Sequence, residues 1–374
     1  MARPQQEKNT PTERLTNAMR AQLRHLVRIQ PSRRPWHMAL AAAIASGVPL
    51  LVGVAFGHID FGMIAMLGGL TFLSLPDTRM QHRMVLMMAI AFGMVACYAL
   101  GALTHFYPPL MILALTLICV VASMTARFYR VPPPGILFLL MAASIAAYTP
   151  ATLADIPLRT GLVALGAVFA CAVAFVYSLH HLRRMPPQLE TPSPGLDFDY
   201  VVVDSLIISA CVGVSLVVAE LLQLHRPYWA PVSCLAILQG ANLRMVWNRH
   251  VHRVVGTIAG LGLAWLLLEL SLGVWEIAAA MILLSFVIEV VVVRNYGLAV
   301  VFITPLTIFL AEATQLGQQS PLVTMQARVL DIAVGSFVGL LGGAALHVPA
   351  LRLRVSQAVR AILRTQADTP GGAA

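Results

Sequence analysis

Apolar residues fill most of this chain in long runs, and short polar stretches separate the runs. An α-helix needs about 20 apolar residues to cross the hydrocarbon core of a bilayer. Runs of this kind recur at residues 36–57, 60–75, 84–104, 108–125, 131–149, 157–179, 200–222, 227–240, 252–270, 272–293, 296–313 and 326–347. The pattern predicts an all-α integral membrane protein with about twelve transmembrane helices.

The composition favours a membrane protein over a water-soluble one. Of the 374 residues, 59% are hydrophobic and 11% are charged, and the mean hydropathy is +0.80. Such a chain has too little polar surface to cover a soluble globule. Outside the apolar runs we expect an N-terminal tail (1–35) with an interfacial amphipathic helix at 13–29, a linker (181–199) and a basic C-terminal tail (348–374). Because 35 mostly polar residues precede the first apolar run, we expect it to be retained and not removed as a signal peptide.

The basic residues predict how the chain is oriented. The net charge is +9, and of the 25 Lys and Arg residues only Arg159, Arg226 and Arg328 fall outside when the N-terminus is placed in the cytoplasm. Positive charge collects on the cytoplasmic side of membrane proteins, so we predict that both termini are cytoplasmic. The basic excess then reflects topology, and we expect no nucleic acid partner.

Several chemical classes lack the residues they need. Lys8 is the single lysine, which excludes a G-x-x-x-x-G-K-[ST] nucleotide loop and a Schiff-base lysine. The five cysteines lie in apolar runs without a C-x-x-C spacing, and His250 and His252, two residues apart, point to different faces of a helix. We therefore expect no enzyme activity, no metal site and no cofactor, and we expect any transport to be secondary or passive.

The second half of the chain repeats landmarks of the first half at an offset of 167 to 170 residues. The landmark pairs are Arg79 and Arg249, Arg83 and Arg253, Arg127 and Arg294, Arg159 and Arg328, and Gly166 and Gly335. We predict two six-helix repeats, at 36–180 and 200–347. Because six is an even number, both repeats enter the membrane from the same side, and a pseudo-twofold axis along the membrane normal relates them.

Each predicted repeat carries an arginine pair at the cytoplasmic end of its third helix. The pairs are Arg79 with Arg83 and Arg249 with Arg253, and residues four apart share one helix face. In one interpretation these side chains reach lipid headgroups and fix the orientation of the helices. In the other, the axis brings both pairs to one vestibule that concentrates anions.

Ionisable residues inside the predicted spans are further candidates, because such residues are costly in lipid and face protein or water. Asp204 and Glu289 lie near the cytoplasmic edge of their helices. They either pair with nearby Arg294 or with hydroxyl groups, or they form a proton-titrating, charge-coupling site.

The outer half of the predicted bundle offers a second set of candidates. Arg328 and Asp331, three residues apart, form either a structural ion pair or, completed by Arg159, an outer gate or anion site. A proline between Thr304 and Thr307 lies near the middle of the membrane, where a proline kink either serves packing alone or exposes backbone to a solute.

Three motifs of the second repeat carry a family resemblance. They are Tyr228-Trp229-Ala230, then Arg253-x-x-Gly256-Thr257-x-x-Gly260, then Ala327-Arg328-x-x-Asp331-x-x-x-Gly335. Together they resemble the fusaric acid resistance family of bacterial inner-membrane proteins, which includes exporters of aromatic carboxylic acids, and the likeness extends over residues 36–347. That family is similar in turn to the plant malate channels. The resemblance implies a location in the bacterial inner membrane and a transport function.

The first repeat departs from these motifs. Leu86, Met87 and Ile90 stand where the second repeat has its glycine and threonine residues, and Leu162 stands in the place of Asp331. Any substrate site shared by the two repeats is therefore expected to be asymmetric.

These observations together predict a secondary transporter that exports organic anions, with aromatic carboxylic acids favoured, through a path between the repeats. The inner arginines would collect the anion, Arg159 and Arg328 would pass it outward, and Tyr228 and Trp229 would stack on its ring. The expected partners are the organic anion and the lipid bilayer. The sequence leaves open whether the protein forms a homo-oligomer or binds a periplasmic adaptor. The alternatives are a major-facilitator-type transporter, an anion channel and a non-transporting membrane scaffold.

Overall fold

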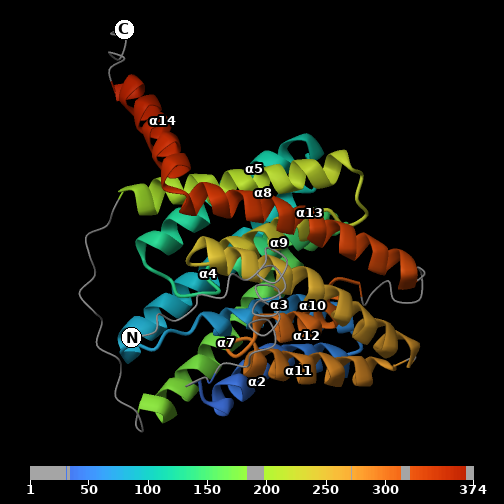
Figure 1. Ribbon diagram of the computed structural model, residues 1–374. Coiled ribbons are helices and arrows are strands. Elements are labelled where there is room, and N and C mark those ends of the chain that lie inside the picture. The colour runs from blue at the N-terminus through green and yellow to red at the C-terminus, as the bar shows by residue number, and fades with distance from the viewer. Residues whose placement is uncertain (1–30, 32–33, 183–197, 271, 313–320, 368–374) are drawn as a thin grey trace, which may run out of the picture.

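The computed structural model describes residues 31, 34–182, 198–270, 272–312 and 321–367. In this part of the chain every regular element is helical, and most of the helices run alongside one another in a single bundle (Figure 1). The helices are α2 (Trp36–Ala55), α3 (Ile59–Gly69), α4 (Met80–Thr104), α5 (Pro108–Phe128), α6 (Leu137–Tyr148), α7 (Asp155–Leu182), α8 (Asp204–Leu221), α9 (Trp229–Leu238), α10 (Leu243–Glu269), α11 (Val274–Val291), α12 (Tyr296–Glu312), α13 (Pro321–His347) and α14 (Pro349–Ala367). The predicted all-α fold class is confirmed.

The twelve predicted apolar runs coincide one by one with helices α2 to α13. Within the described residues, eight helices are long and apolar enough to cross a membrane, namely α2, α4, α5, α7, α8, α10, α11 and α13. The remaining four, α3, α6, α9 and α12, are apolar but shorter. The long helices alone make this a multi-pass membrane protein.

The short helices lie inside the bundle, where the long helices shield them from lipid. All ten residues of α9 are buried, whereas α5 buries only Met111, Leu115, Cys119 and Ser123 of its 21 residues. At 1.5 Å per residue α9 is about 15 Å long, which is half of the hydrocarbon core. Helix ends at membrane depth are tolerated only within protein, so the short elements occupy the centre.

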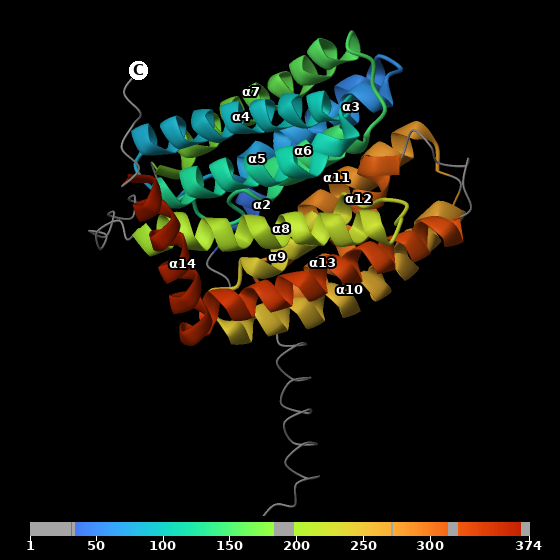
Figure 2. The same ribbon diagram turned by 90° about the horizontal axis from the view of Figure 1, so that it is seen from above.

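Helices at corresponding positions in the two halves make corresponding contacts. Helix α2 packs on α3, α7 and α11, and α8 packs on α9, α13 and α5. Likewise α4 packs on α6 and α7, and α10 packs on α12 and α13. The blue and green helices of the first half lie beside the yellow and red helices of the second half (Figure 2).

Two glycines at corresponding positions bring backbones into direct contact. A methyl group on Gly166 of α7 would lie 1.8 Å from the carbonyl oxygen of Ala65 in α3. A methyl group on Gly335 of α13 would lie 2.1 Å from the carbonyl oxygen of Ala230 in α9. Small residues are the usual means of close helix packing in membranes, where lipid supplies no hydrophobic drive.

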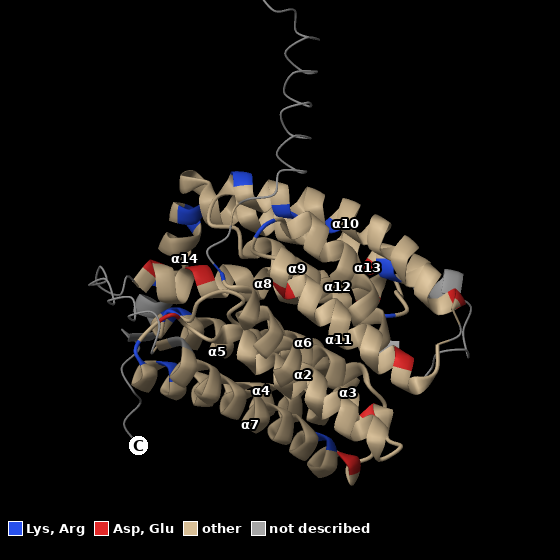
Figure 3. Ribbon diagram, turned by 90° about the horizontal axis from the view of Figure 1, so that it is seen from below, with Lys and Arg blue, Asp and Glu red and all other residues tan. Residues whose placement is uncertain are grey.

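One end of the bundle, at which α2, α4, α8 and α10 begin, gathers most of the described arginines, and we call it the arginine-rich end (Figure 3). Helices α4 and α10 extend further toward this end than predicted, because their polar first turns continue the helix beyond the apolar run. Helix α10 begins nine residues earlier than expected, at Leu243 and not at 252, and the side chain of Asn242 caps it by accepting a hydrogen bond from the Met245 amide at 2.9 Å.

The C-terminal tail differs from the expectation, since most of it folds as α14, which follows α13 at the arginine-rich end (Figure 2). Arg360 of α14 pairs with Asp199 at 2.7 Å, and Arg352 pairs with Asp204 at 3.2 Å. The amphipathic helix expected at 13–29 and most of the linker expected at 181–199 lie outside the described residues.

Candidate functional site

A cavity of about 950 Å³ lies between the two halves of the bundle. Its walls come from α2, α3, α4, α6 and α7 of the first half and from α9, α10, α11 and α12 of the second half. At the arginine-rich end it is lined by the exposed residues Asp77, His82 and Arg130, whereas at its inner end it is lined by the buried Trp229 and Thr307. The cavity therefore opens at one end of the bundle and is closed at the other.

Arg253 of α10 is the most deeply buried charge in the cavity wall. The residue is 5% exposed, and its guanidinium donates to the Ser233 hydroxyl of α9 at 3.2 Å. Its Nε makes no hydrogen bond, and within the described chain no carboxylate pairs with it. Burying an unpaired charge is costly, so this guanidinium is suited to an anion supplied from the cavity.

Arg249 lies one helical turn closer to the opening of the same cavity. Its guanidinium donates to the carbonyl oxygen of Ala236 in α9 at 2.9 Å and lies 5.1 Å from the ring of Tyr296. Neither contact neutralises the charge. Arg249 and Arg253 therefore make one wall of the cavity cationic.

The predicted counterparts in the first half do not form an equivalent wall. Arg83 is 1% exposed and is paired with Asp77 at 2.8 Å, and it also donates to the Thr78 carbonyl at 2.7 Å and to the Ser178 hydroxyl at 3.4 Å. Arg79 is exposed and, like Arg83, is not part of the cavity wall. The two arginine pairs thus have different environments, in line with the expected asymmetry.

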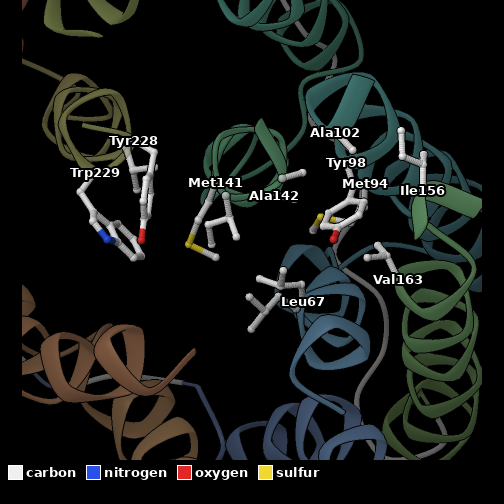
Figure 4. Packing of buried hydrophobic residues seen from close by; sticks show 14 residues of the cluster. Leu67, Met94, Tyr98, Ala102, Met141, Ala142, Ile156, Val163, Tyr228 and Trp229 are labelled. Atoms are coloured by element: carbon white, nitrogen blue, oxygen red, sulfur yellow. The ribbon is translucent and has the colours of Figure 1, made fainter. Parts of the chain in front are cut away.

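The closed end of the cavity is formed by aromatic residues and Arg328. The Arg328 guanidinium lies 3.5 Å from the centre of the Trp229 ring and donates to the Thr307 hydroxyl. Trp229 contacts Tyr228 at 5.2 Å between ring centres, and Tyr228 contacts Tyr148 at 5.7 Å. Figure 4 shows Tyr228 and Trp229 extending from α9 toward Met141 of α6. Trp229 and Thr307 thus line this end of the cavity, and Arg328 and Tyr228 pack against Trp229.

Of the other predicted outer residues, Arg159 does not join this cluster. Arg159 lies at the start of α7, where it donates to the carbonyl oxygen of Pro150 at 2.9 Å, and it is not in the cavity wall. Asp331 is fully buried in α13. Thr304 is buried and donates to the Val300 carbonyl at 2.9 Å, while α12 continues as one helix through Pro305.

The two carboxylates near the arginine-rich end form ion pairs with partners other than the expected Arg294. Asp204 pairs with Arg127 of α5 and Arg352 of α14, both at 3.2 Å. Glu289 of α11 pairs with Arg34, which precedes α2, at 2.9 Å. Asp204 thus joins helices away from the cavity, whereas the Glu289 pair lies in the cavity wall and joins the two halves.

Sequence reasoning missed several cavity residues. Ser233 and Ser285 line or support the cavity but are unremarkable as single serines in apolar helices. Arg34 belongs to a polar segment that the hydrophobic pattern assigns to the tail. Asp77 could have been found by comparing the two halves. The first half has a carboxylate, Asp77, six residues before Arg83, and the second half has Trp247 at the same spacing before Arg253.

The fold and the cavity define a class of protein: a multi-pass α-helical membrane protein with an arginine-lined cavity between two halves. Residues 214–342, which run from α8 to α13, match the family described as fusaric acid resistance protein-like. The predicted resemblance to the fusaric acid resistance family is confirmed by this match, which contains Trp229, Arg253 and Arg328.

A curated bacterial protein is similar over nearly the whole chain. The uncharacterized membrane protein YvaC of Bacillus subtilis (strain 168) is 22% identical, and the alignment covers 91% of this chain and 77% of that protein. No solved structure matches the chain.

Proposed function

We propose that this protein is a secondary transporter that exports organic anions, with aromatic carboxylates favoured, from the bacterial cytoplasm through the cavity between its two halves. The observation that carries the proposal is Arg253, a guanidinium that is 5% exposed, lines the cavity and has no carboxylate partner in the described chain. A charge held in this way is stabilised when a ligand brings the counter-charge.

Under this proposal the chain consists of two parallel six-helix repeats, and the short helices α3, α6, α9 and α12 complete twelve membrane segments. The matching contacts of α2 and α8 and the matching glycine contacts at Gly166 and Gly335 support this arrangement. Parallel repeats place a solute site at the interface between them, which is where the cavity lies.

The orientation follows from the charge distribution. The described arginines outside the arginine-rich end are Arg159, Arg226 and Arg328. The positive-inside rule therefore places the opening of the cavity, and both termini, on the cytoplasmic side. In this orientation the structure is open to the cytoplasm and closed on the outside by Trp229 and Tyr228.

The membrane potential favours the export of anions without hydrolysis of a nucleotide. With the inside of the cell negative, each unit of negative charge that leaves gains about 2.3 kcal/mol per 100 mV. The protein must mainly remove the barrier that a charge meets in the hydrocarbon core. Arg249 and Arg253 lower that barrier on the cytoplasmic side, and Arg328 lies beyond Trp229 on the route outward.

The test is efflux of radiolabelled benzoate from proteoliposomes that contain the purified protein. We expect saturable efflux that accelerates when a potassium gradient with valinomycin makes the lumen negative. Efflux that rises linearly with benzoate concentration would instead favour an anion channel. No efflux above that of protein-free liposomes, for benzoate and for a panel of other aromatic and aliphatic carboxylates, would contradict transport and favour a scaffold.

A further inference from the structure

We infer that the cavity holds one anion site per chain, built on α9, in which Arg253 binds a single carboxylate and Trp229 stacks on the flat ring attached to it. This inference rests on the proposed function but concerns binding alone. It assigns the site to the second half of the bundle and excludes an equivalent site at Arg83 in the first half.

Three arginines contact α9 at successive helical turns. Arg249 donates to Ala236, Arg253 donates to Ser233, and Arg328 lies against the Trp229 ring. Residues three and four apart lie on one face of a helix, with one turn spanning about 5.4 Å. Charge is therefore presented along one face of α9, from the cavity mouth to its closed end.

Arg253, the middle arginine of the three, lies among groups that can bind an anion. The Arg253 guanidinium donates a hydrogen bond to the Ser233 hydroxyl at 3.2 Å, and this contact fixes the position of the guanidinium. The Nε of Arg253 makes no hydrogen bond and can donate one to a ligand. The hydroxyl of Ser285 in α11 is also buried, lines the cavity and makes no hydrogen bond. A carboxylate carries a negative charge and lone pairs on two oxygens, so it can accept hydrogen bonds from both groups.

The ring subsite lies one turn deeper. Trp229 lines the cavity four residues before Ser233, so its indole lies on the same face of α9 as the arginine anchor. The indole N–H is buried and makes no hydrogen bond. A ring directly bonded to a carboxylate spans about one helical turn, so it would place its face against Trp229 when the carboxylate is at Arg253.

The first half cannot form the same site, because its arginine already has an internal carboxylate. Asp77 pairs with Arg83 at 2.8 Å, whereas Trp247 occupies the corresponding sequence position before Arg253. Gly62 and Met66 stand where α9 has Trp229 and Ser233, so α3 offers neither a stacking ring nor a hydroxyl. Only one half therefore retains the features that bind a carboxylate.

The experiment measures binding to the detergent-purified full chain through the fluorescence of Trp229. The other four tryptophans, Trp36, Trp247, Trp265 and Trp275, are exposed and are replaced by Phe to leave a single reporter. Benzoate should quench the reporter saturably with one site per chain, whereas the neutral analogue benzamide should bind at least about tenfold more weakly, since it lacks the charge that Arg253 recognises.

Three variants locate the site. Arg253→Gln should weaken benzoate binding at least about tenfold, and Ser233→Ala should weaken it about two- to tenfold by releasing the guanidinium. Arg79→Gln, at an exposed arginine outside the cavity wall, is the matched control and should not change it. Thermal melts verify folding, and Ser233→Ala decides the question if Arg253→Gln does not fold.

The outcomes separate the site from the transport function. Saturable benzoate binding that depends on Arg253, without efflux from proteoliposomes, would support the site and overturn the proposed function. Equal binding of benzoate and benzamide, undiminished binding in Arg253→Gln and Ser233→Ala, or two sites per chain would overturn the inference. Absence of benzoate binding to the parent chain would overturn it as well.

Discussion

Replacing Gly335 with alanine tests whether the backbone contact between α13 and α9 positions the closed end of the cavity. The added methyl would lie 2.1 Å from the carbonyl oxygen of Ala230, about 1.3 Å short of the 3.4 Å at which ordinary contact begins. The methyl carbon is bonded directly to the backbone and the oxygen belongs to it, so neither atom can move aside by a side-chain rotation. The two helices must therefore separate. Overpacking of this kind costs about 1–3 kcal/mol, and the value here should fall in the upper part of that range.

The matched control is Gly262→Ala in α10. A methyl group at Gly262 meets no atom within 4 Å, and the residue is exposed. Alanine stabilises a helix by about 1 kcal/mol relative to glycine, so this variant should melt at or above the parent temperature. The two variants should therefore differ by at least about 2 kcal/mol, which corresponds to about 4 °C or more.

A thiol-reactive fluorescent dye gives the assay, because all five cysteines are buried or half-buried in the folded chain. Unfolding exposes the thiols, and the midpoint of the fluorescence rise reports the melting temperature. Gly335→Ala should also weaken benzoate binding, since separating α13 from α9 moves Arg328 away from Trp229. Equal melting temperatures for Gly335→Ala and Gly262→Ala would refute the close-packing argument.

Two further substitutions probe the ion pairs at the arginine-rich end. Asp204→Asn should lower the melting temperature by about 2–6 °C, because the ion pairs with Arg127 and Arg352 are lost. Trypsin should also release α14 faster from this variant than from the parent chain. An unchanged digestion pattern would contradict this role of Asp204. Arg34→Gln should lower benzoate affinity several-fold by leaving the negative charge of Glu289 in the cavity wall, and Arg34→Gln with Glu289→Gln should restore it; a double variant as weak as the single one would show that Arg34 acts by another route.

The helices and their order were predictable because lipid imposes a simple rule on the sequence. Each apolar run became a helix from α2 to α13. The tail helix α14 was missed because it has no apolar run of membrane length and is held by ion pairs to Asp199 and Asp204, which lie about 150 residues earlier in the chain.

The candidate site was predictable in part. The arginine pair at Arg249 and Arg253 does line a cavity between the halves, and Trp229 does line its closed end. The candidates Arg79 and Arg83 do not line this cavity, and a local carboxylate at Asp77 already pairs with the Arg83 guanidinium. Arg294 was wrong as the ion-pair partner of Asp204 and Glu289. The actual partners, Arg127 and Arg34, lie far away in the sequence, and their positions depend on how the helices pack.

The most direct measurement is a cryo-electron microscopy structure of the full chain with 4-iodobenzoate, whose iodine marks the ring in the density. We expect one ligand per chain, with its carboxylate against Arg253 and its ring against Trp229. A cavity without ligand density at saturating concentration, or a ligand bound at Arg83 in place of Arg253, would contradict it.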